Sequence, residues 1–172
     1  MSAAAAPLIL TAQLPPALHR RFTELRRAYY PPERNVLEAH VTLFHALPPM
    51  VESELGELLG RIAAESAPAR GRLEGVMRYD QGTAIALASP ELLELRDTIA
   101  DRFHGLLTAQ DSHRPRLHVT VQNKVSPREA QRLQALLAGT IPAESFAFPG
   151  LALHRYRGGP WEFVRRWAFR GK

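Results

Sequence analysis

The sequence contains no cysteine in its 172 residues. Such a chain forms no disulfide framework and no thiolate metal site, and the absence fits a cytoplasmic protein. No apolar run approaches the ~20 residues that a membrane span needs. The apolar start, Met1 to Leu14, has no Lys or Arg in front of it, which argues against a secretory signal. We therefore expect a cytoplasmic protein with no membrane partner.

Lysine is also scarce, because only Lys124 and Lys172 occur among 22 basic residues. The net charge of +5 and the pI of about 10.2 therefore rest on arginine. Arginine is suited to bidentate contacts with phosphate, and a basic chain favours a polyanionic partner such as RNA or a nucleotide. A solvated basic surface explains the same charge. The sequence has neither a Gly-rich phosphate loop nor a recognisable Ser-His-Asp set.

Length and composition indicate one globular unit. With 45% hydrophobic and 23% charged residues, the chain resembles an ordinary soluble domain. It has no low-complexity segment and no obvious flexible linker. We expect residues 1–172 to form a single two-lobed domain.

Two short segments repeat nearly the same pattern. Residues 40–43 read His-Val-Thr-Leu, and residues 118–121 read His-Val-Thr-Val. Because side chains alternate along a strand, His and Thr share one face and the aliphatic residues share the other. Two imidazoles and two hydroxyls that face one cavity would form a site for acid–base chemistry on a phosphate.

The surrounding elements are duplicated as well. The two histidines are 78 residues apart, and the same offset maps a hairpin turn at Asp80 onto a second turn at Gly158. We expect an α+β fold that is bilobal, with duplicated modules, two antiparallel sheets flanking a central cleft and helices on the outside. The predicted strands are Leu8–Leu14, Leu37–Leu47 and Leu117–Asn123; the helices are Ala17–Tyr29, Glu52–Ala64, Pro90–Leu107 and Pro127–Ala138; the hairpins combine Arg72–Tyr79 with Thr83–Ala88 and Phe146–Arg155 with Trp161–Phe169.

The paired motifs and the order of the elements resemble the two-histidine phosphoesterases, the superfamily of 2′-5′ RNA ligase-like proteins and cyclic phosphodiesterases. That family carries two copies of His-x-(Thr/Ser)-x, and the likeness covers roughly Leu8 to Phe169. It implies chemistry without a metal or cofactor on 2′,3′-cyclic phosphates or 2′-5′ linkages. The implied substrates are RNA ends or small cyclic nucleotides.

The resemblance also implies a role for each motif residue. One histidine deprotonates water and the other protonates the leaving ribose oxygen. The family favours His118 as the base and His40 as the acid, although the repeat leaves the reverse open. Thr42 and Thr120 would donate hydrogen bonds to the non-bridging phosphate oxygens.

Further candidates flank the motifs. Phe44 is predicted to lie on the His40 face and to stack on a base, and Gln122 to lie on the His118 face. Tyr29, Tyr30, Tyr156 and Trp161 are aromatic candidates for the cleft, of which we choose Tyr156. Lys124, Arg155 and Arg157 are possible phosphate contacts. His45 and His113 are five positions from a motif histidine, which places them on the opposite face and argues against a metal site.

Two other interpretations stay open. The chain could be a non-catalytic RNA-binding module that keeps the cleft and its charge, or a structural α+β domain whose two motifs coincide by chance. The presence of both histidines and both threonines favours the enzyme over the binding module. A structure in which the two imidazoles converge within reach of one phosphate would reject the third interpretation. We expect it to act as a monomer.

Overall fold

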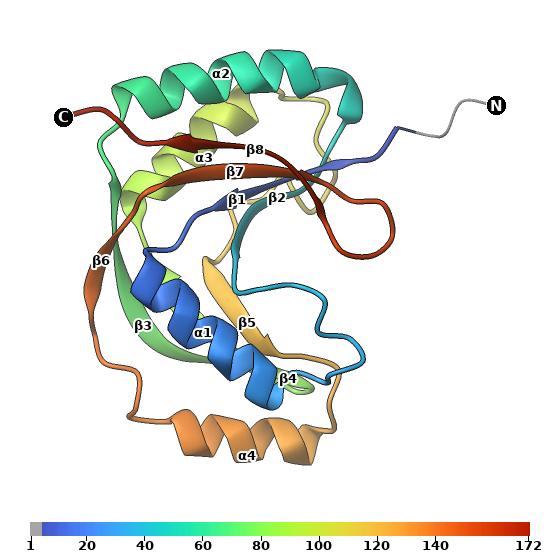
Figure 1. Ribbon diagram of the computed structural model, residues 1–172, viewed down its shortest axis with the longest axis vertical. Coiled ribbons are helices and arrows are strands. Elements are labelled where there is room, and N and C mark those ends of the chain that lie inside the picture. The colour runs from blue at the N-terminus through green and yellow to red at the C-terminus, as the bar shows by residue number, and fades with distance from the viewer. Residues whose placement is uncertain (1–4) are drawn as a thin grey trace.

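The computed structural model describes residues 5–172, which fold into two four-stranded antiparallel sheets and four α-helices (Figure 1). Sheet A has the strand order β2-β1-β7-β8, and sheet B has the order β5-β4-β3-β6. Sheet A consists of β2 (Val41–Leu47), β1 (Leu8–Ala12), β7 (Gly150–Arg155) and β8 (Glu162–Ala168). Sheet B consists of β5 (His118–Gln122), β4 (Gly82–Ala88), β3 (Ala69–Tyr79) and β6 (Ser145–Phe148). The predicted fold class is confirmed.

Two of the four helices lie at opposite ends of the molecule (Figure 1). Helix α2 (Glu52–Glu65) packs on β7 and β8, and α4 (Pro127–Leu137) packs on β3 and β4 (Figure 1). Helix α1 (Pro16–Tyr29) lies against β5, and α3 (Pro90–Arg102) lies against β3. A short 3₁₀ turn, Pro49–Val51, leads into α2. No helix in the described part of the chain is long and apolar enough to cross a membrane.

Local capping chemistry defines where two of the helices begin. Ser89 accepts a hydrogen bond from the backbone N–H of Leu92, and Ser126 accepts one from the backbone N–H of Glu129. Both are the N-cap residues that the sequence predicts, each followed by proline at the first helical position. Helix α3 ends at Arg102, about a turn before the predicted end at Leu107.

The two sequence halves exchange their hairpins. The first half supplies β1 and β2 to sheet A, but its hairpin β3–β4 joins β5 in sheet B. The hairpin β7–β8 of the second half crosses in the opposite direction and pairs with β1. Each sheet is therefore assembled from both halves, so the lobes do not correspond to the repeats.

One predicted strand is wrong. The sequence pattern predicts a continuous strand over Phe146–Arg155, whereas the structure divides it into β6 in sheet B and β7 in sheet A. Pro149 lies at the break, where its missing N–H cannot contribute to a strand ladder. Gly150 follows it because a Cβ there would lie 2.3 Å from the carbonyl oxygen of Trp167. This Pro-Gly step moves the chain between the sheets.

The buried side chains form one cluster across both sheets. Leu10 of β1, Ile85 of β4 and Leu59 of α2 all belong to it, and all are completely buried. The two sheets are therefore held together by a shared apolar core.

Candidate active site

The two motifs lie on the edge strands of different sheets. His40 immediately precedes β2, and His118 begins β5. These two edge strands approach each other. The buried guanidinium of Arg26 donates through Nε to the carbonyl of Leu37 at 3.1 Å and through Nη1 to the carbonyl of Thr120 at 2.8 Å. A single side chain of α1 thus joins the loop before His40 to the second motif.

Both histidines are held in the same way. Nδ1 of His40 lies 2.7 Å from the carbonyl oxygen of Glu38, and Nδ1 of His118 lies 2.7 Å from that of Arg116. A carbonyl only accepts, so each Nδ1 is assigned the proton in this bond. In the neutral rings Nε2 then carries the free lone pair. Each imidazole is thereby oriented to accept or, once charged, to donate a proton at Nε2.

His40 lies against aromatic and cationic neighbours. Its ring centroid is 4.6 Å from that of Trp161, edge to face, and the ring of His154 lies 5.5 Å from the same indole. Burial lowers the pKa of His40 to about 4, although the hydrogen bond to Glu38 opposes this. The positive charges of Arg26, His154 and His118 lower that pKa further. His40 is therefore neutral in the empty site at neutral pH.

The threonines are partly buried and have free hydroxyls. Neither Thr42 nor Thr120 makes a side-chain hydrogen bond with another residue in the 5–172 range. Both follow their histidine by two positions along the strand, and so lie on its face. The second histidine also has an aromatic neighbour, since the ring of Tyr79 lies 6.4 Å from that of His118.

Phe44 and Gln122 do not lie where the period-two rule places them. Phe44 is completely buried under the guanidinium of Arg96, and Gln122 is buried with its amide oxygen accepting from the hydroxyl of Thr83. The cause is the same in both copies: a register shift between Thr42 and Phe44, and another between Thr120 and Gln122. Such a β-bulge adds a residue and ends the alternation. The expectation that Phe44 and Gln122 face a ligand is corrected accordingly.

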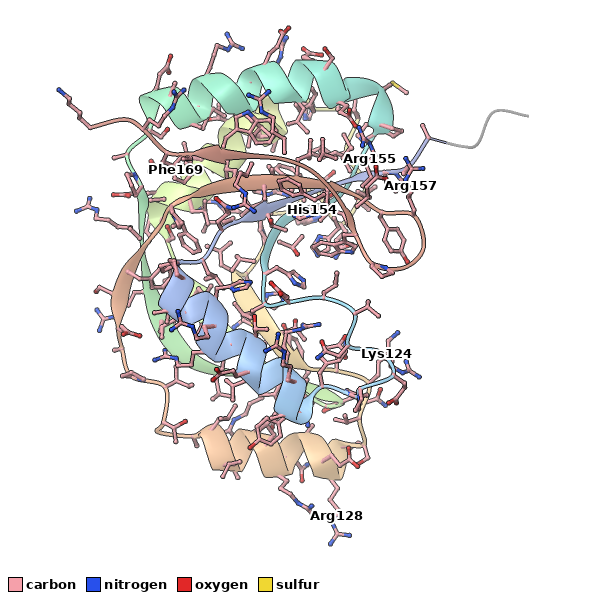
Figure 2. The ribbon with its side chains drawn as sticks, viewed as in Figure 1. Lys124, Arg128, His154, Arg155, Arg157 and Phe169 are labelled. Carbon is pink, nitrogen blue, oxygen red and sulfur yellow. The ribbon has the colours of Figure 1, made fainter. Side chains whose placement is uncertain are left out.

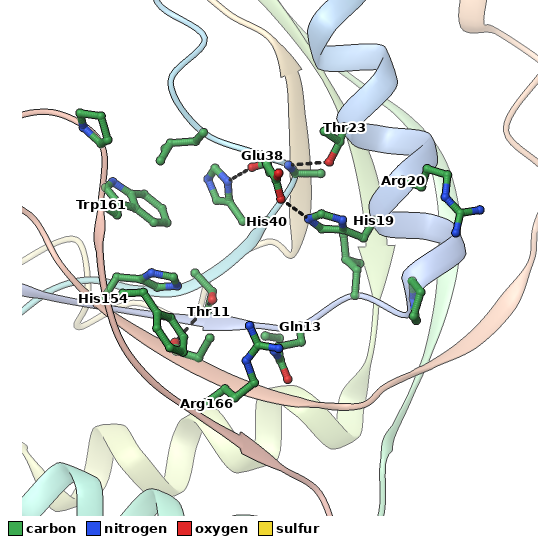
Figure 3. Close-up of a pocket in the computed structure, with 18 of the residues that line it drawn as sticks. Thr11, Gln13, His19, Arg20, Thr23, Glu38, His40, His154, Trp161 and Arg166 are labelled. Carbon is green, nitrogen blue, oxygen red and sulfur yellow. Dashed lines mark hydrogen bonds and ion pairs between the residues drawn. The ribbon is translucent and has the colours of Figure 1, made fainter.

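A cavity of about 880 Å³ opens beside His40 (Figure 3). Its walls come from β1, β7, β8, α1 and the loop before β2; of the four motif residues only His40 lines it, and Thr42, His118 and Thr120 do not. The cavity is therefore asymmetric and extends from the His40 side of the paired motifs. Its lining includes Thr11, Gln13, His19, His154, Trp161 and Arg166.

Several of these residues were not selected from the sequence. His154 and Arg166 were missed as site residues, and in the β7–β8 hairpin Trp161 rather than Tyr156 lines the cavity. Tyr156 is exposed and its backbone N–H binds the carbonyl of Pro7. The sequence did contain a signal for these residues. Side chains alternate along β7 and β8, and this alternation places His154 on the same face as Ala152.

The predicted phosphate contacts lie outside this cavity. Arg155 forms ion pairs with Glu52 and Glu162, and Arg157 pairs with Glu162. Figure 2 shows Arg155 and Arg157 near the β7–β8 hairpin and Lys124 in the lower half of the view. None of the three lines the cavity. Among residues 5–172, no group of three or more His, Asp or Glu side chains is arranged to hold a metal ion.

The fold and the site define a two-lobed α+β protein in which a His-x-Thr motif from each of two edge strands lies at the junction of the sheets. The profile of the 2′-5′ RNA ligase superfamily matches residues 14–160, which include both motifs. The chain belongs to this superfamily. No curated protein sequence matches it.

Solved structures show the same fold. TT0787 of Thermus thermophilus aligns with a TM-score of 0.68 at 19% identity, over 96% of this chain and 99% of that one. A structure described as a phosphoesterase aligns with a TM-score of 0.64 at 22% identity, over 95% and 98%. LigT of E. coli in complex with 3′-AMP aligns with a TM-score of 0.62 at 20% identity, over 95% and 98%. The likeness extends over nearly the whole length of each chain.

Proposed function

We propose that the protein is a phosphoesterase that opens 2′,3′-cyclic phosphates at RNA ends or on nucleotides, with His40 and His118 as its acid–base pair. The observation that carries this proposal is that the same kind of hydrogen bond, from Nδ1 to a backbone carbonyl, orients both imidazoles. Each motif histidine donates through Nδ1 to the carbonyl two residues earlier, which leaves Nε2 for the reaction. Superfamily membership supports the proposal, as does LigT of E. coli, which has been solved with phosphate and with 3′-AMP.

The reaction is an in-line displacement at phosphorus. Nε2 of one histidine takes a proton from water while the water oxygen forms a bond to phosphorus. The bond from phosphorus to one ribose oxygen breaks, and that oxygen takes a proton from Nε2 of the other histidine. The free hydroxyls of Thr42 and Thr120 donate to the non-bridging oxygens, where negative charge develops. A 2′-5′ diester is cleaved in the same way, with the neighbouring ribose 3′-hydroxyl in place of water: its oxygen bonds to phosphorus, the bond to the 5′ oxygen breaks, and a 2′,3′-cyclic phosphate and a 5′-hydroxyl result. The reverse reaction is a ligation.

The asymmetry of the cavity supports a role for each histidine. Attacking and leaving oxygens lie on opposite sides of phosphorus, and the 880 Å³ cavity extends only from the His40 side. The nucleoside that carries the leaving ribose oxygen fits there, so we assign His40 as the acid and His118 as the base. His40 is neutral in the empty site because its pKa is about 4. It gains its proton when the phosphate anion binds, since a nearby negative charge raises an imidazole pKa.

The test is an assay of a 2′,3′-cyclic nucleotide and a 2′-5′-linked dinucleotide, with EDTA present. We expect turnover by the native protein and its loss in both His40→Ala and His118→Ala, with His45→Ala as the matched control. His45 is exposed and binds Asp111 rather than the cavity. Unchanged turnover in either motif variant would exclude the two-histidine mechanism. Salt-dependent RNA binding without turnover on either substrate would instead identify a binding module.

A further inference from the structure

The cavity beside His40 carries excess positive charge. Arg20, Arg27 and Arg166 line it, against Glu38 as the one lining carboxylate among the described residues. That carboxylate is already occupied, because it pairs with Nε2 of His19 at 3.1 Å. No carboxylate within residues 5–172 forms an ion pair with any of the three arginines.

Outside the cavity, arginines occur both with and without carboxylate partners; Arg61, Arg78 and Arg128, for example, have none within residues 5–172. Six exposed or half-exposed arginines are paired with carboxylates: Arg21, Arg70, Arg102, Arg114, Arg155 and Arg157. Arg166 instead lies near a second basic group, His154. Burial lowers the pKa of His154, and the positive charge of Arg166 lowers it further. The Arg166 guanidinium lies over the ring of Phe163, 5.4 Å from its centroid, and forms no ion pair with a carboxylate of residues 5–172, so its charge could be balanced by an anion.

Sheet register places Arg166 in line with the first motif. Thr42 of β2 pairs with Thr11 of β1, Thr11 with Ala152 of β7, and Ala152 with Arg166 of β8. Directly paired residues share a face, so all four side chains lie on the same side of sheet A. The row spans three strand spacings, about 14 Å between its end backbones. Its two middle members, Thr11 and Ala152, are short and leave the floor of the cavity open.

The side chains at the far end of this row are suited to a second phosphate. Figure 3 shows Arg166 directed from β8 into the cavity beside Gln13, whereas His19 on α1 is directed toward Glu38. The side-chain amide of Gln13 makes no hydrogen bond with the described residues and is a free donor. Trp161 lines the same cavity and lies against His40, with 4.6 Å between the ring centroids, so a nucleoside that joins the two phosphates would have an aromatic ring beside it.

We propose that Arg166, with Gln13, forms a subsite for a second phosphoryl group, attached to the 5′ oxygen of the nucleoside whose cyclic phosphate is opened. The inference rests on the proposed function and deepens it by naming the substrate class. The preferred substrate is a nucleotide with phosphate at both ends of the ribose. The 5′ phosphoryl group is either a terminal monophosphate or the link to a preceding nucleotide of an RNA.

Three adenosine substrates test the subsite: the 2′,3′-cyclic phosphate alone, the same compound with a 5′-monophosphate, and a dinucleotide that ends in the cyclic phosphate. We expect kcat/KM to be about tenfold higher with a 5′ phosphoryl group, the size of one charge-assisted contact. The gain should appear in KM. A gain in the dinucleotide alone would assign the group to an RNA chain, and a larger gain in the monophosphate would assign it to a free 5′ end.

Arg166→Gln should bring that ratio close to one, and Arg166→Lys should keep part of it. Arg165→Gln is the matched control, because Arg165 lies on the opposite face of β8, with its guanidinium 5.3 Å from the ring centroid of Trp167. An equal kcat/KM for all three substrates in the native protein would overturn the subsite, as would an unchanged ratio in Arg166→Gln.

Binding separates this inference from the proposed function. If no cyclic phosphate is turned over, the proposed function fails, but calorimetry still examines the subsite. Adenosine 2′,5′-bisphosphate should then bind about tenfold more tightly than adenosine 2′-phosphate, and the difference should disappear in Arg166→Gln. Equal affinities would exclude the subsite whatever the catalytic result.

Discussion

At the scale of single residues, the site depends on which polar atoms are already occupied. Nδ1 of each motif histidine is engaged by a carbonyl, whereas the hydroxyls of Thr42 and Thr120 have no partner within the described chain. A bound ligand can therefore take up the hydroxyls without breaking an existing bond. The constraint on the imidazoles and the freedom of the hydroxyls are what a transition state with charge on its non-bridging oxygens requires.

Replacing Thr42 or Thr120 by valine removes the hydroxyl while keeping the shape of the side chain. We expect kcat to fall about 10²-fold in each variant, the usual cost of one lost donor to a developing oxyanion. Steady-state kinetics on the 2′,3′-cyclic nucleotide measures the effect. Serine at the same position keeps the hydroxyl and should retain most of the activity. A valine variant as fast as its serine counterpart would remove the hydroxyls from the mechanism.

Trp161 should control the protonation of His40. Burial holds the pKa of His40 at about 4, and the indole of Trp161 covers one side of its ring. Because burial disfavours the charged imidazolium, Trp161→Ala admits water and should raise that pKa toward its ordinary value of 6.5. Proton NMR titration of the His40 ring measures the shift directly.

The same change should appear in kinetics. The rising limb of the kcat/KM profile, near pH 4 in the native protein, should move to higher pH in Trp161→Ala, because an acid–base pair gives this limb at its lower pKa. Tyr156→Ala is the control, since Tyr156 belongs to the same hairpin but is exposed. A limb that does not move would show that the indole does not set the pKa of His40.

At the scale of elements, β2 has a second register shift, between Phe44 and Leu47, and a buried carboxylate holds the backbone there. Asp111, 1% exposed, accepts from the backbone N–H groups of His45 and Ala46, at 2.9 Å each for the shortest contacts. Arg96 of α3 donates to the carbonyls of Leu43 and Asp111. Asp111 belongs to the loop before the second motif, and it holds β2, the strand that carries the first motif. The two motifs are therefore coupled through elements that are far apart in the sequence.

Asp111→Asn should reduce the free energy of unfolding at pH 7 by about 2–3 kcal/mol, because one of the accepting oxygens becomes a donor that faces N–H groups. Burial would raise the pKa of Asp111, but the hydrogen bonds from His45 and Ala46 outweigh it and lower the pKa below 3.8. The stabilisation is therefore complete above this value and is lost as the pH falls through the pKa of the folded state. Urea unfolding at a series of pH values measures it.

The difference between Asp111→Asn and the native protein should accordingly shrink as the pH falls below 3.8. Asp97→Asn is the control, because Asp97 forms an exposed ion pair with Arg114, for which a change under about 1 kcal/mol is expected. A difference that stays constant down to acid pH would show that the charge of Asp111 does not stabilise the fold.

The elements also show what the sequence can and cannot predict. Alternation correctly gave the aliphatic sides of both motif strands, since Val41 and Val119 are completely buried. It failed two residues beyond each threonine, at Phe44 and Gln122, because a bulge depends on the pairing with a neighbouring strand and leaves no mark in the strand's own pattern. The break at Pro149 was readable from the residue type alone.

At the scale of the whole molecule, the exchange of hairpins determines the composition of the site. His40 comes from the first half, but Trp161, His154 and Arg166 beside its cavity come from the second. The duplication and its offset of 78 residues are visible in the sequence, whereas the exchange is not, because each hairpin could pair equally well within its own half. Residues missed from the sequence are mostly those that the exchange brings across.

The exchange also predicts how the protein unfolds. Neither sheet is complete without strands from both halves, and one apolar cluster spans both sheets, so residues 1–172 should unfold as one cooperative unit. Trp161 and Trp167, the two tryptophans of the chain, both belong to the β7–β8 hairpin of sheet A and its connecting loop. Their fluorescence therefore reports on sheet A, while far-ultraviolet circular dichroism reports on the whole molecule.

We expect the two signals to give the same midpoint in urea. A Tyr79→Trp variant adds a reporter at the end of β3 in sheet B, and the signal it adds should share that midpoint. Because the ring of Tyr79 is half exposed, the substitution should perturb the core little. A separate, earlier transition at position 79 would show that sheet B unfolds on its own. The two lobes would then be independent domains, and the single-domain prediction would be wrong.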